Sequence, residues 1–233
     1  MPIAPAIFIA ATDTEVGKTL VSALLVDFLH RQGLPVGYQK WVATGCSGEL
    51  PEDLAVVTDC AATELLAPQL AVPYRFKLPA SPHLAAAEEG RRVEPELLRQ
   101  KLAQARATGR WLVVEGVGGL LVPLNRQLLL IDLLAQSGLP VLLVARSGLG
   151  TINHTLLSLE ALRSRQIPVA GVVLSDEAAG LPELIVADNR RTIAELGRVP
   201  VIGRLPRRPE IKQLREDFAP MGQELLVFCR NFR

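Results

Sequence analysis

The residues with the clearest chemistry lie near the start of the chain, at positions 12–19, which read TDTEVGKT. An apolar run ending at Ala11 precedes them, and a helix-length segment begins at Lys18. In such a strand, loop and helix arrangement, backbone N–H groups around Gly17 surround phosphates, Lys18 reaches the β- and γ-phosphate oxygens, and Thr19 ligates Mg²⁺. The segment therefore predicts a phosphate-binding loop and phosphoryl transfer from a nucleotide.

This loop departs from the general phosphate-loop pattern in two ways. The general pattern has a glycine five positions before Gly17, where this chain has Thr12. Asp13 and Glu15 also place carboxylates inside a loop that binds phosphate, which is unfavourable unless a cation or an amine lies nearby. We therefore expect the loop to contact an amine-bearing substrate as well as a nucleotide.

Two further polar side chains lie near the carboxyl ends of predicted strands. Glu115 ends an apolar run and is followed by the glycine-rich residues 116–119, and Lys40 lies near the end of another run. In open α/β sheets, ligands bind outside the carboxyl ends of the strands. Glu115 is therefore a candidate Mg²⁺ ligand, and Lys40 a point charge for phosphate or carboxylate. The alternative for each is a solvated surface side chain.

A sheet must position these residues, and the sequence predicts one. Six apolar runs are typical of parallel strands covered on both faces: residues 7–9, 36–42, 111–115, 140–145, 169–174 and 201–202. Five helix-length segments lie between or after them: residues 18–31, 94–107, 128–136, 151–164 and 184–196. Four glycines are predicted to end helices: Gly33, Gly109, Gly138 and Gly197. Short connectors favour right-handed βαβ units.

We therefore predict an α/β fold with three layers, built on a doubly wound, mostly parallel sheet. The sequence shows no composition shift or low-complexity segment that would separate domains, so we expect a single domain over residues 1–233. Residues 45–90 are less regular and form a long excursion after the second predicted strand. Such excursions usually carry substrate contacts.

Composition excludes several classes of protein. Hydrophobic residues make up 49% of the chain and charged residues 21%, and the formal net charge is +1. We therefore expect a globular protein whose overall charge is too small to attract nucleic acid or an anionic membrane surface. Cys46, Cys60 and Cys229 are odd in number and widely spaced, which favours reduced thiols in a cytoplasmic protein. No apolar run approaches the roughly 18–20 residues that a membrane span needs.

Taken together, residues 12–19, 40–45, 81–83, 115–119 and 150–154 resemble the dethiobiotin synthetases, ATP-dependent enzymes of biotin biosynthesis with a P-loop NTPase-like fold. The resemblance implies a cyclo-ligase that forms the ureido ring of dethiobiotin from 7,8-diaminononanoate, CO₂ and ATP. A carbamate and its anhydride with phosphoric acid would be intermediates, and ADP and phosphate would be released. The resemblance also implies Mg²⁺ and a homodimer whose substrate site is completed across the interface.

The same resemblance implies roles for individual residues. Lys40 and Lys18 would be catalytic, and Mg²⁺ would be held by Thr19, Asp53 and Glu115. Substrate binding is expected from Thr14, Thr44 and, across the dimer interface, Asn153. Nucleotide binding is expected from Glu15, Val16, Gly17, Lys18, Thr19, Leu20, Asp53, Glu115, Gly116, Val117, Gly118, Ser175, Asp176 and Pro206. His83 and His154 are expected to be structural.

The chain departs from the family pattern at three positions. Ala11 replaces the first glycine of the loop, and Trp41 replaces a proline that usually follows the active-site lysine. We expect the Trp41 ring to pack beside the site. Ser175 replaces an asparagine that reads adenine in many members. Because serine offers a shorter and less directional hydrogen-bonding edge, the sequence does not fix which nucleobase is preferred.

Two alternatives use the same fold. A partitioning or metal-insertion ATPase would carry an additional lysine early in a glycine-rich loop, and residues 10–14 contain none. A regulatory nucleotide-binding module without synthetase activity would tend to lose the charged residues of the site. The presence of Lys18, Lys40 and Glu115 favours an enzyme over such a module.

Overall fold

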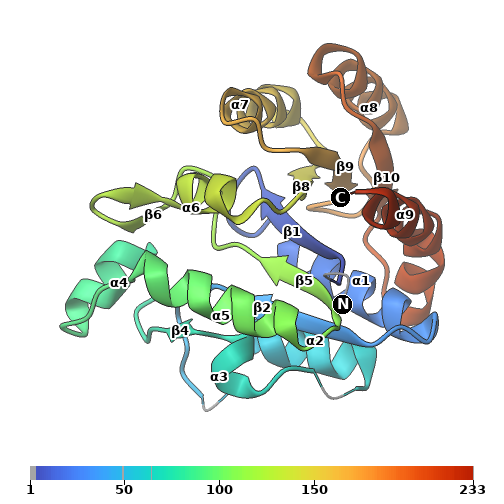
Figure 1. Cartoon of the computed structure of the whole chain (residues 1–233). Helices are drawn as coiled ribbons and strands as arrows, with labels where there is room; N and C mark the ends of the chain where they lie inside the picture. The colour runs from blue at the N-terminus through green and yellow to red at the C-terminus, as the bar shows by residue number, and fades with distance from the viewer. Residues whose placement is uncertain (1–3, 49, 64, 233) are drawn as a thin grey trace.

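A computed structural model describes residues 4–48, 50–63 and 65–232 of the chain. Its centre is a parallel sheet of six strands in the order β10-β9-β8-β1-β5-β2 (Figure 1). These strands are β1 (Ala6–Ala11), β2 (Val36–Lys40), β5 (Trp111–Glu115), β8 (Val141–Arg146), β9 (Val169–Ser175) and β10 (Val201–Leu205). Each of the six predicted apolar runs forms one of these strands, and the doubly wound α/β prediction is confirmed.

Nine helices occur in the described part of the chain. They are α1 (Lys18–Arg31), α2 (Glu52–Ala61), α3 (Pro68–Ala71), α4 (Pro82–Glu88), α5 (Pro95–Ala107), α6 (Leu130–Ser137), α7 (Thr151–Ser164), α8 (Glu183–Gly197) and α9 (Ile211–Asn231). Right-handed crossovers place α1 on one face of the sheet and α5 to α8 on the other, because the chain reverses its direction along the sheet at β2. α9 packs against α1 and so covers the first face.

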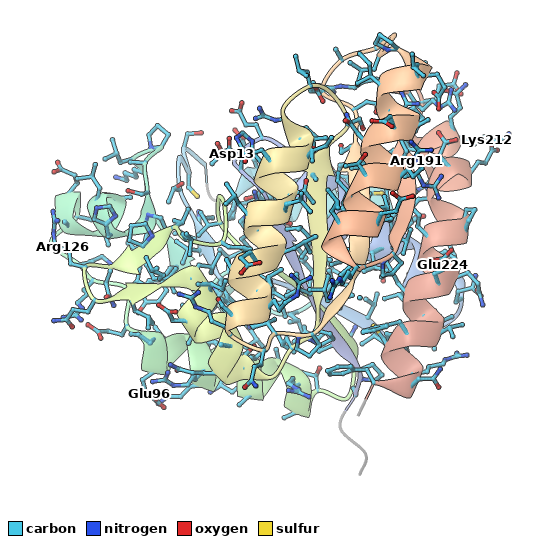
Figure 2. All side chains as sticks on the ribbon, turned by 90° about the horizontal axis from the view of Figure 1, so that it is seen from above. Asp13, Glu96, Arg126, Arg191, Lys212 and Glu224 are labelled. Carbon is cyan, nitrogen blue, oxygen red and sulfur yellow. The ribbon has the colours of Figure 1, made fainter. Side chains whose placement is uncertain are left out.

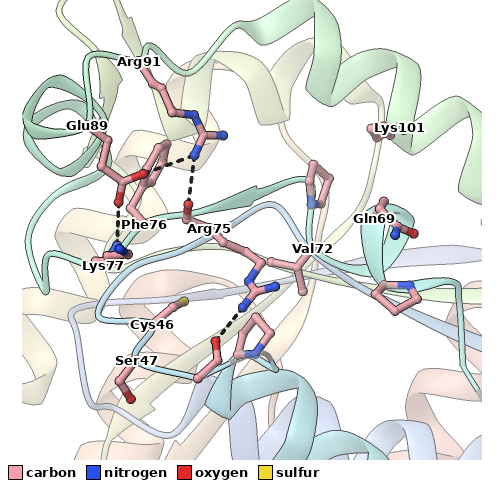
Figure 3. Close-up of a pocket in the computed structure, with 14 residues that line it drawn as sticks. Cys46, Ser47, Gln69, Val72, Arg75, Phe76, Lys77, Glu89, Arg91 and Lys101 are labelled. Atoms are coloured by element: carbon pink, nitrogen blue, oxygen red, sulfur yellow. Dashed lines mark hydrogen bonds and ion pairs between the residues drawn. The ribbon is translucent and has the colours of Figure 1, made fainter.

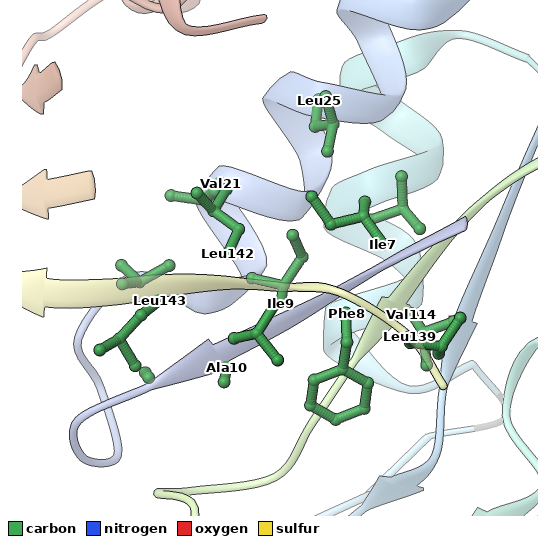
Figure 4. Close-up of a cluster of buried hydrophobic side chains, with 14 of the residues drawn as sticks. Ile7, Phe8, Ile9, Ala10, Val21, Leu25, Val114, Leu139, Leu142 and Leu143 are labelled. Atoms are coloured by element: carbon green, nitrogen blue, oxygen red, sulfur yellow. The ribbon is translucent and has the colours of Figure 1, made fainter. Parts of the chain in front are cut away.

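The strands are mostly apolar because both of their faces are covered. On β1, Ile7 and Ile9 point towards Val21 and Leu25 of α1, whereas Phe8 points to the opposite side (Figure 4). All five side chains are buried. Successive side chains of a strand alternate between its faces, so a strand between two helical layers has no polar face.

Residues 45–90 contain more regular structure than the sequence predicts. Besides α2, α3 and α4, a short parallel pair joins β3 (Val42–Ala43) to β4 (Tyr74–Arg75). The predicted strand over residues 36–42 is therefore divided at Trp41. The extended run splits because β2 pairs with β5, whereas β3 leaves the sheet to pair with β4.

Two predicted helix ends are wrong. The helix predicted from residue 128 begins at Leu130, because β7 (Leu128–Leu129) instead pairs with β6 (Pro123–Asn125) in a hairpin. Gly197 is not the terminal cap of α8 but lies inside it, and Arg198 adopts the left-handed conformation. A Cβ at Gly197 would lie 2.7 Å from Leu159 of α7, so the glycine permits close helix packing. Gly138 caps α6 in the left-handed conformation, as predicted.

An ionic cluster around the buried Asp27 joins three helices on the α1 face. Arg215 of α9 donates two hydrogen bonds of 3.0 Å to the carboxylate of Asp27 in α1. Its Nη2 also donates to the carbonyl oxygen of Cys60 in α2 at 2.8 Å. Arg31 donates to the same carboxylate at 2.8 Å. The cluster fixes α2 and α9 against the helix that follows the phosphate loop.

Charges of both signs are distributed around the surface, as the labelled residues of Figure 2 illustrate. All three cysteines are free thiols, and burial raises the pKa of Cys229 to about 12. Among the described residues, none of the helices combines the length and apolar composition that a membrane crossing requires. The assignment of residues 1–233 to a single domain stays a prediction.

Candidate active site

The loop between β1 and α1 has the backbone geometry of an anion site. Glu15 and Gly17 both have positive φ, 54° and 103°, and Val16 between them does not. When left-handed and right-handed backbone conformations alternate in this way, successive N–H groups point into one concavity, which can bind an anion. Positive φ in a residue other than glycine costs of order 1–3 kcal/mol and tends to occur at functional sites. The loop is thus shaped in advance for a phosphate group.

Lys18 bends back over this loop. Its Nζ donates a hydrogen bond of 2.9 Å to the carbonyl oxygen of Asp13. The side chain is buried, and burial together with repulsion from Lys40 lowers the pKa of Lys18 to about 8. Glu115 and Asp53 oppose that shift. Within the described residues, the Asp13 carbonyl is the one acceptor for this buried ammonium, which is therefore well suited to receive phosphate oxygens.

The glycine segment after β5 packs directly against the phosphate loop. A Cβ at Gly119 would lie 3.3 Å from the carbonyl oxygen of Thr12, and one at Gly116 would lie 3.0 Å from Phe8. Gly118 has a φ of +59°, and a Cβ there would lie 2.8 Å from Val122. The absence of a side chain at Gly119 lets this segment approach the phosphate loop closely, and the same absence at Gly116 and Gly118 permits close packing on Phe8 and Val122.

The side chains of Lys40 and Glu115, both predicted near strand ends, contact each other. Lys40 and Glu115 occupy paired positions at the ends of the neighbouring strands β2 and β5. The Lys40 Nζ donates to the Glu115 Oε1 at 2.6 Å and lies 3.1 Å from the Asp53 Oδ2. The Thr19 hydroxyl lies 2.6 Å from the Asp53 Oδ1 and 2.9 Å from the Glu115 Oε1. Lys40 and Glu115 are buried, so neither is the solvated side chain of the alternative interpretation.

The charges of this cluster stabilise one another. Burial lowers the pKa of Lys40, but the carboxylates of Glu115 and Asp53 raise it by more, so the net pKa lies above its ordinary value. Burial raises the pKa of Asp53, but Lys40 and the hydrogen bond from Thr19 lower it by more. Both groups are therefore charged at neutral pH. The cluster holds fixed charges where water is largely excluded, which strengthens their effect on a ligand.

The oxygen atoms in the cluster fit the demands of Mg²⁺. Neighbouring oxygens around this ion are about 3 Å apart, because its bonds are about 2.0–2.1 Å long and octahedral. The Thr19 hydroxyl oxygen lies 2.6 and 2.9 Å from the nearest carboxylate oxygens of Asp53 and Glu115. No group of three His, Cys, Asp or Glu side chains suited to a metal occurs among the described residues. Mg²⁺ would therefore depend on phosphate oxygens for its remaining ligands.

A cavity of about 590 Å³ opens beside the cluster. Its lining includes six of the predicted site residues: Thr14, Glu15, Thr44, Asp53, Val117 and Gly118. A second cavity of about 530 Å³ shares Cys46 and Pro51 with it but contains none of the predicted site residues (Figure 3). In the second cavity, Arg75 donates a hydrogen bond to the carbonyl oxygen of Gly48, and Arg91 donates one to the carbonyl oxygen of Arg75. The first cavity is the candidate substrate site.

The predicted nucleobase residues lie at the ends of β9 and β10. Ser175 packs beneath the phosphate loop, where a Cβ on Gly17 would lie 2.7 Å from its Oγ. Asp176 accepts two hydrogen bonds, of 2.9 and 2.8 Å, from Arg204. Arg204 also donates to Glu183 at 2.6 Å. Pro206 follows β10 directly and is half-buried. These residues lie on the other side of the phosphate loop from the Lys40 cluster.

Asn153 is not brought into this cluster. It is exposed in the first turn of α7, as is His154 beside it. Leu149, just before this helix, is 96% exposed. His83 lies in the first turn of α4 and bonds to Ser81 at 3.0 Å, which fits the predicted structural role. Trp41, directly after β2, is buried and packs edge-on against Phe8 of β1.

Two residues near the site were missed by the sequence analysis. The Tyr38 hydroxyl donates to the Glu115 Oε2 at 2.9 Å, and burial beside that carboxylate raises the pKa of Tyr38 well above its ordinary value. Arg146, at the end of β8, donates to the carbonyl oxygen of Thr14 at 3.3 Å. The position of Tyr38 two residues before Lys40, on the same face of a strand, was the signal that could have identified it.

The fold and this site define a class of protein, the P-loop nucleotide-binding proteins. A profile described as AAA domain matches residues 5–215. Solved structures share the fold at low sequence identity. The MinD cell division protein of Aquifex aeolicus has a TM-score of 0.59 and 13% identity, over 96% of this chain and 98% of that one. A ParA family ATPase from Chlorobium tepidum has a TM-score of 0.55 and 12% identity, over 98% and 93%.

Sequence relatives narrow this class to one family. The ATP-dependent dethiobiotin synthetase of Brucella ovis is 41% identical over 97% of this chain and 93% of its own length. The biotin biosynthesis bifunctional protein of Bordetella avium is 44% identical over 86% of this chain and 39% of its own length. The chain belongs to the ATP-dependent dethiobiotin synthetase family.

Proposed function

We propose that this chain closes the ureido ring of dethiobiotin, as its family membership indicates. CO₂ adds to one amine of 7,8-diaminononanoate to form a carbamate, and ATP transfers its γ-phosphoryl group to a carbamate oxygen. The second amine then attacks the carbonyl carbon of this mixed anhydride. The bond from that carbon to the phosphate oxygen breaks, so the ring closes and phosphate leaves, with ADP as the other product.

The observation that carries this proposal is the position of Lys40, whose Nζ lies within 3.1 Å of two carboxylates beside the candidate substrate cavity. Transfer of a phosphoryl group to a carbamate brings two anions together, and positioned cations stabilise the charge that develops. We assign Lys40 to the carbamate and the transferred phosphoryl group, and Lys18 to the β- and γ-phosphates. Both ammonium groups are buried, which strengthens their electrostatic effect.

Other residues bind and orient the two substrates. We assign the ATP phosphates to the backbone N–H groups of residues 15–20 and the neighbouring glycine segment, residues 116–118. The nucleobase would lie near Ser175, Asp176 and Pro206. Thr14 and Thr44, which line the candidate cavity, would hold the diamine and its carbamate. These assignments agree with the acidic loop, since Glu15 would attract the amines of the substrate.

Mg²⁺ is proposed to bind Thr19, Asp53 and Glu115 together with ATP. The ion would neutralise charge on the β- and γ-phosphate oxygens. The spacing of the three protein oxygens supports this proposal. Thr19 begins the helix that follows the phosphate loop, so its hydroxyl orients the ligand set relative to the phosphates.

A homodimer is proposed to complete the substrate site, with Asn153 supplied by the partner subunit. Leu149, Leu121 and Leu157 are exposed, at 96%, 56% and 61%. Contiguous apolar patches mark protein interfaces, and we propose that the dimer buries these three side chains in one patch. We place this dimer in the cytoplasm, which the free thiols support, and propose neither nucleic acid nor membrane as a partner.

The reaction is tested with purified protein, 7,8-diaminononanoate, bicarbonate, Mg²⁺ and ATP, following both dethiobiotin and phosphate. The expected result is equal amounts of the two products, dependent on the diamine. Nucleotide binding without diamine-dependent phosphate release, for every nucleoside triphosphate tested, would contradict the proposal and favour the regulatory module.

The shared site is tested by subunit exchange. Lys40→Ala and Asn153→Ala variants, each of low activity alone, are mixed under conditions that exchange subunits. If Asn153 acts across the interface, a mixed dimer contains one site with both defects and one intact site. Activity should then rise on mixing. Activity that stays at the average of the two variants would place Asn153 in its own subunit's site or outside the site.

A further inference from the structure

Tyr38 lies in the same strand as Lys40 and on the same face. The two residues are separated by one position in β2, and they pair with Val113 and Glu115 of β5. Gln39 between them points to the opposite face, where its Nε2 bonds to the carbonyl oxygen of Leu70. Because side chains alternate along a strand, the Tyr38 hydroxyl and the Lys40 ammonium both reach the carboxylate of Glu115.

The two oxygens of Glu115 have different partners. Oε1 accepts from Lys40 at 2.6 Å and from Thr19 at 2.9 Å. Oε2 accepts from the Tyr38 hydroxyl at 2.9 Å, and no other side chain in the described ranges bonds to it. Tyr38 and Glu115 are both fully buried, so water does not replace this bond. The hydroxyl thus holds the side of the carboxylate that faces away from the cluster.

We propose that Tyr38 is a positioning residue that sets the rotation of the Glu115 carboxylate and so keeps Oε1 directed at Thr19 and Lys40. The terminal torsion of glutamate is soft and has two broad minima, so packing alone does not fix it. Because the two carboxylate oxygens rotate together, a hydrogen bond that holds one of them also fixes the direction of the other. Partners of this kind, which touch a metal ligand rather than the metal, are known to tune metal affinity. The inference rests on the proposed assignment of Glu115 to Mg²⁺.

The chain offers a matched control, because it contains only one other tyrosine. Tyr74 is also buried, and its hydroxyl accepts a 2.8 Å hydrogen bond from the backbone N–H of Glu94, away from the cluster. Tyr38→Phe and Tyr74→Phe each remove one hydroxyl of a buried tyrosine with its hydrogen bond and keep the ring. A general loss of stability should therefore appear in both variants, and a change in metal binding in one.

The experiment measures Mn²⁺ affinity in the presence of a non-hydrolysable ATP analogue, by electron paramagnetic resonance. Tyr38→Phe should weaken Mn²⁺ binding about 10-fold to 100-fold, the usual effect of losing such a partner. Tyr74→Phe should leave the affinity unchanged. In steady-state assays, Tyr38→Phe should lower kcat while the KM for the diamine stays the same. Equal Mn²⁺ affinities of wild type and Tyr38→Phe would overturn the proposal.

A second comparison keeps the proposal falsifiable if Tyr38→Phe weakens the fold in general. The same substitution is made in a Glu115→Gln background, and the Mn²⁺ affinities of the four proteins form a double-mutant cycle. Tyr38→Phe should have little further effect there, since the carboxylate that it orients is gone. An equal effect in both backgrounds would show that Tyr38 does not act through Glu115. These titrations use no diamine, so their outcome is independent of whether ring closure occurs.

Discussion

At the ends of β1, β2 and β5, charged side chains point at one another inside the protein, whereas at the ends of β9 and β10 they form ion pairs that reach the surface. Lys40 and Glu115 belong to the first region, and both are buried. In the second region Arg204 bridges the buried Asp176 to Glu183, whose side chain is 78% exposed. The two regions flank the same phosphate loop, yet only the first concentrates charge at one point.

This difference indicates that the first region takes part in the reaction, whereas the second stabilises the fold. In the first region the carboxylates and ammonium groups are close enough to be shared with phosphate, carbamate or a cation. In the second, the guanidinium of Arg204 already bonds to two carboxylates, whose negative charge offsets its positive charge towards a ligand. We therefore expect substitutions in the first region to change turnover, and substitutions in the second to change stability or nucleobase preference.

The largest expected effect is that of Lys40→Ala. Loss of a charge that stabilises the transition state should lower kcat by about 10²-fold to 10³-fold, with nucleotide affinity largely retained. Stopped-time assays of dethiobiotin and titration with a fluorescent ATP analogue measure the two quantities. Lys101→Ala, in the neighbouring cavity, is the matched control and should behave like wild type. A rate close to wild type in Lys40→Ala would remove Lys40 from the mechanism.

Glu115→Gln should have the next largest effect. The amide keeps the shape of the side chain but not its charge, so the Mg²⁺ concentration at half-maximal rate should rise by more than the about 10-fold to 100-fold expected for loss of a partner that touches only a ligand. The measurement is the rate as a function of Mg²⁺ at saturating ATP. Excess Mg²⁺ should restore part of the activity. A Mg²⁺ dependence identical to that of wild type would contradict the assignment of Glu115 as a ligand.

Arg204→Ala should change stability rather than chemistry. It leaves the buried carboxylate of Asp176 without its partner, which should lower the free energy of unfolding by about 1–3 kcal/mol. Urea denaturation measures this loss, and kcat at saturating ATP should be close to that of wild type. A fall in kcat as large as that of Glu115→Gln would mean that the two regions are not separated as described.

The smallest effect concerns Ser175. Its hydroxyl packs beneath Gly17, so we expect it to contribute little to reading the base, and wild-type enzyme to discriminate weakly among nucleobases. Ser175→Ala should change the ratio of kcat/KM between ATP and GTP by about 3-fold or less, the equivalent of one weak hydrogen bond. A change of about 10-fold or more in this ratio would show that Ser175 does read adenine.

The sequence was most informative where local pattern and chemistry coincide. The boundaries of α1 are as predicted, because the loop pattern marks its start and a glycine follows its end. Lys40 and Glu115 could be placed at strand ends from apolar runs alone. That they meet in one cluster depends on β5 lying between β1 and β2, and strand order is a property of the whole chain. The partner of each charge was therefore beyond the reach of local pattern.

Other features of the fold and the site could not be predicted from the sequence, for physical reasons. The helices between residues 45 and 90 are short, and two of them begin at proline, so they show little of the periodicity that identifies longer helices. Asp53 was assigned only through resemblance, and it reaches the cluster because α2 packs against α1. Tyr38 reads as an ordinary strand residue, since aromatic residues are common in strands. Its bond to Glu115 exists only once the strands pair.

The bond between Asp27 and Arg215 also bears on how the chain reaches its folded state. It joins residues 188 positions apart, and β1 pairs with β5 and β8, which are likewise distant in sequence. Contacts of such long range form slowly, because a large loop must close before they contribute any stability. During synthesis the amino-terminal part of a chain emerges first. The contact between α1 and α9 therefore forms only after α9 has been synthesised, and the surface of α1 that packs against α9 is exposed until then.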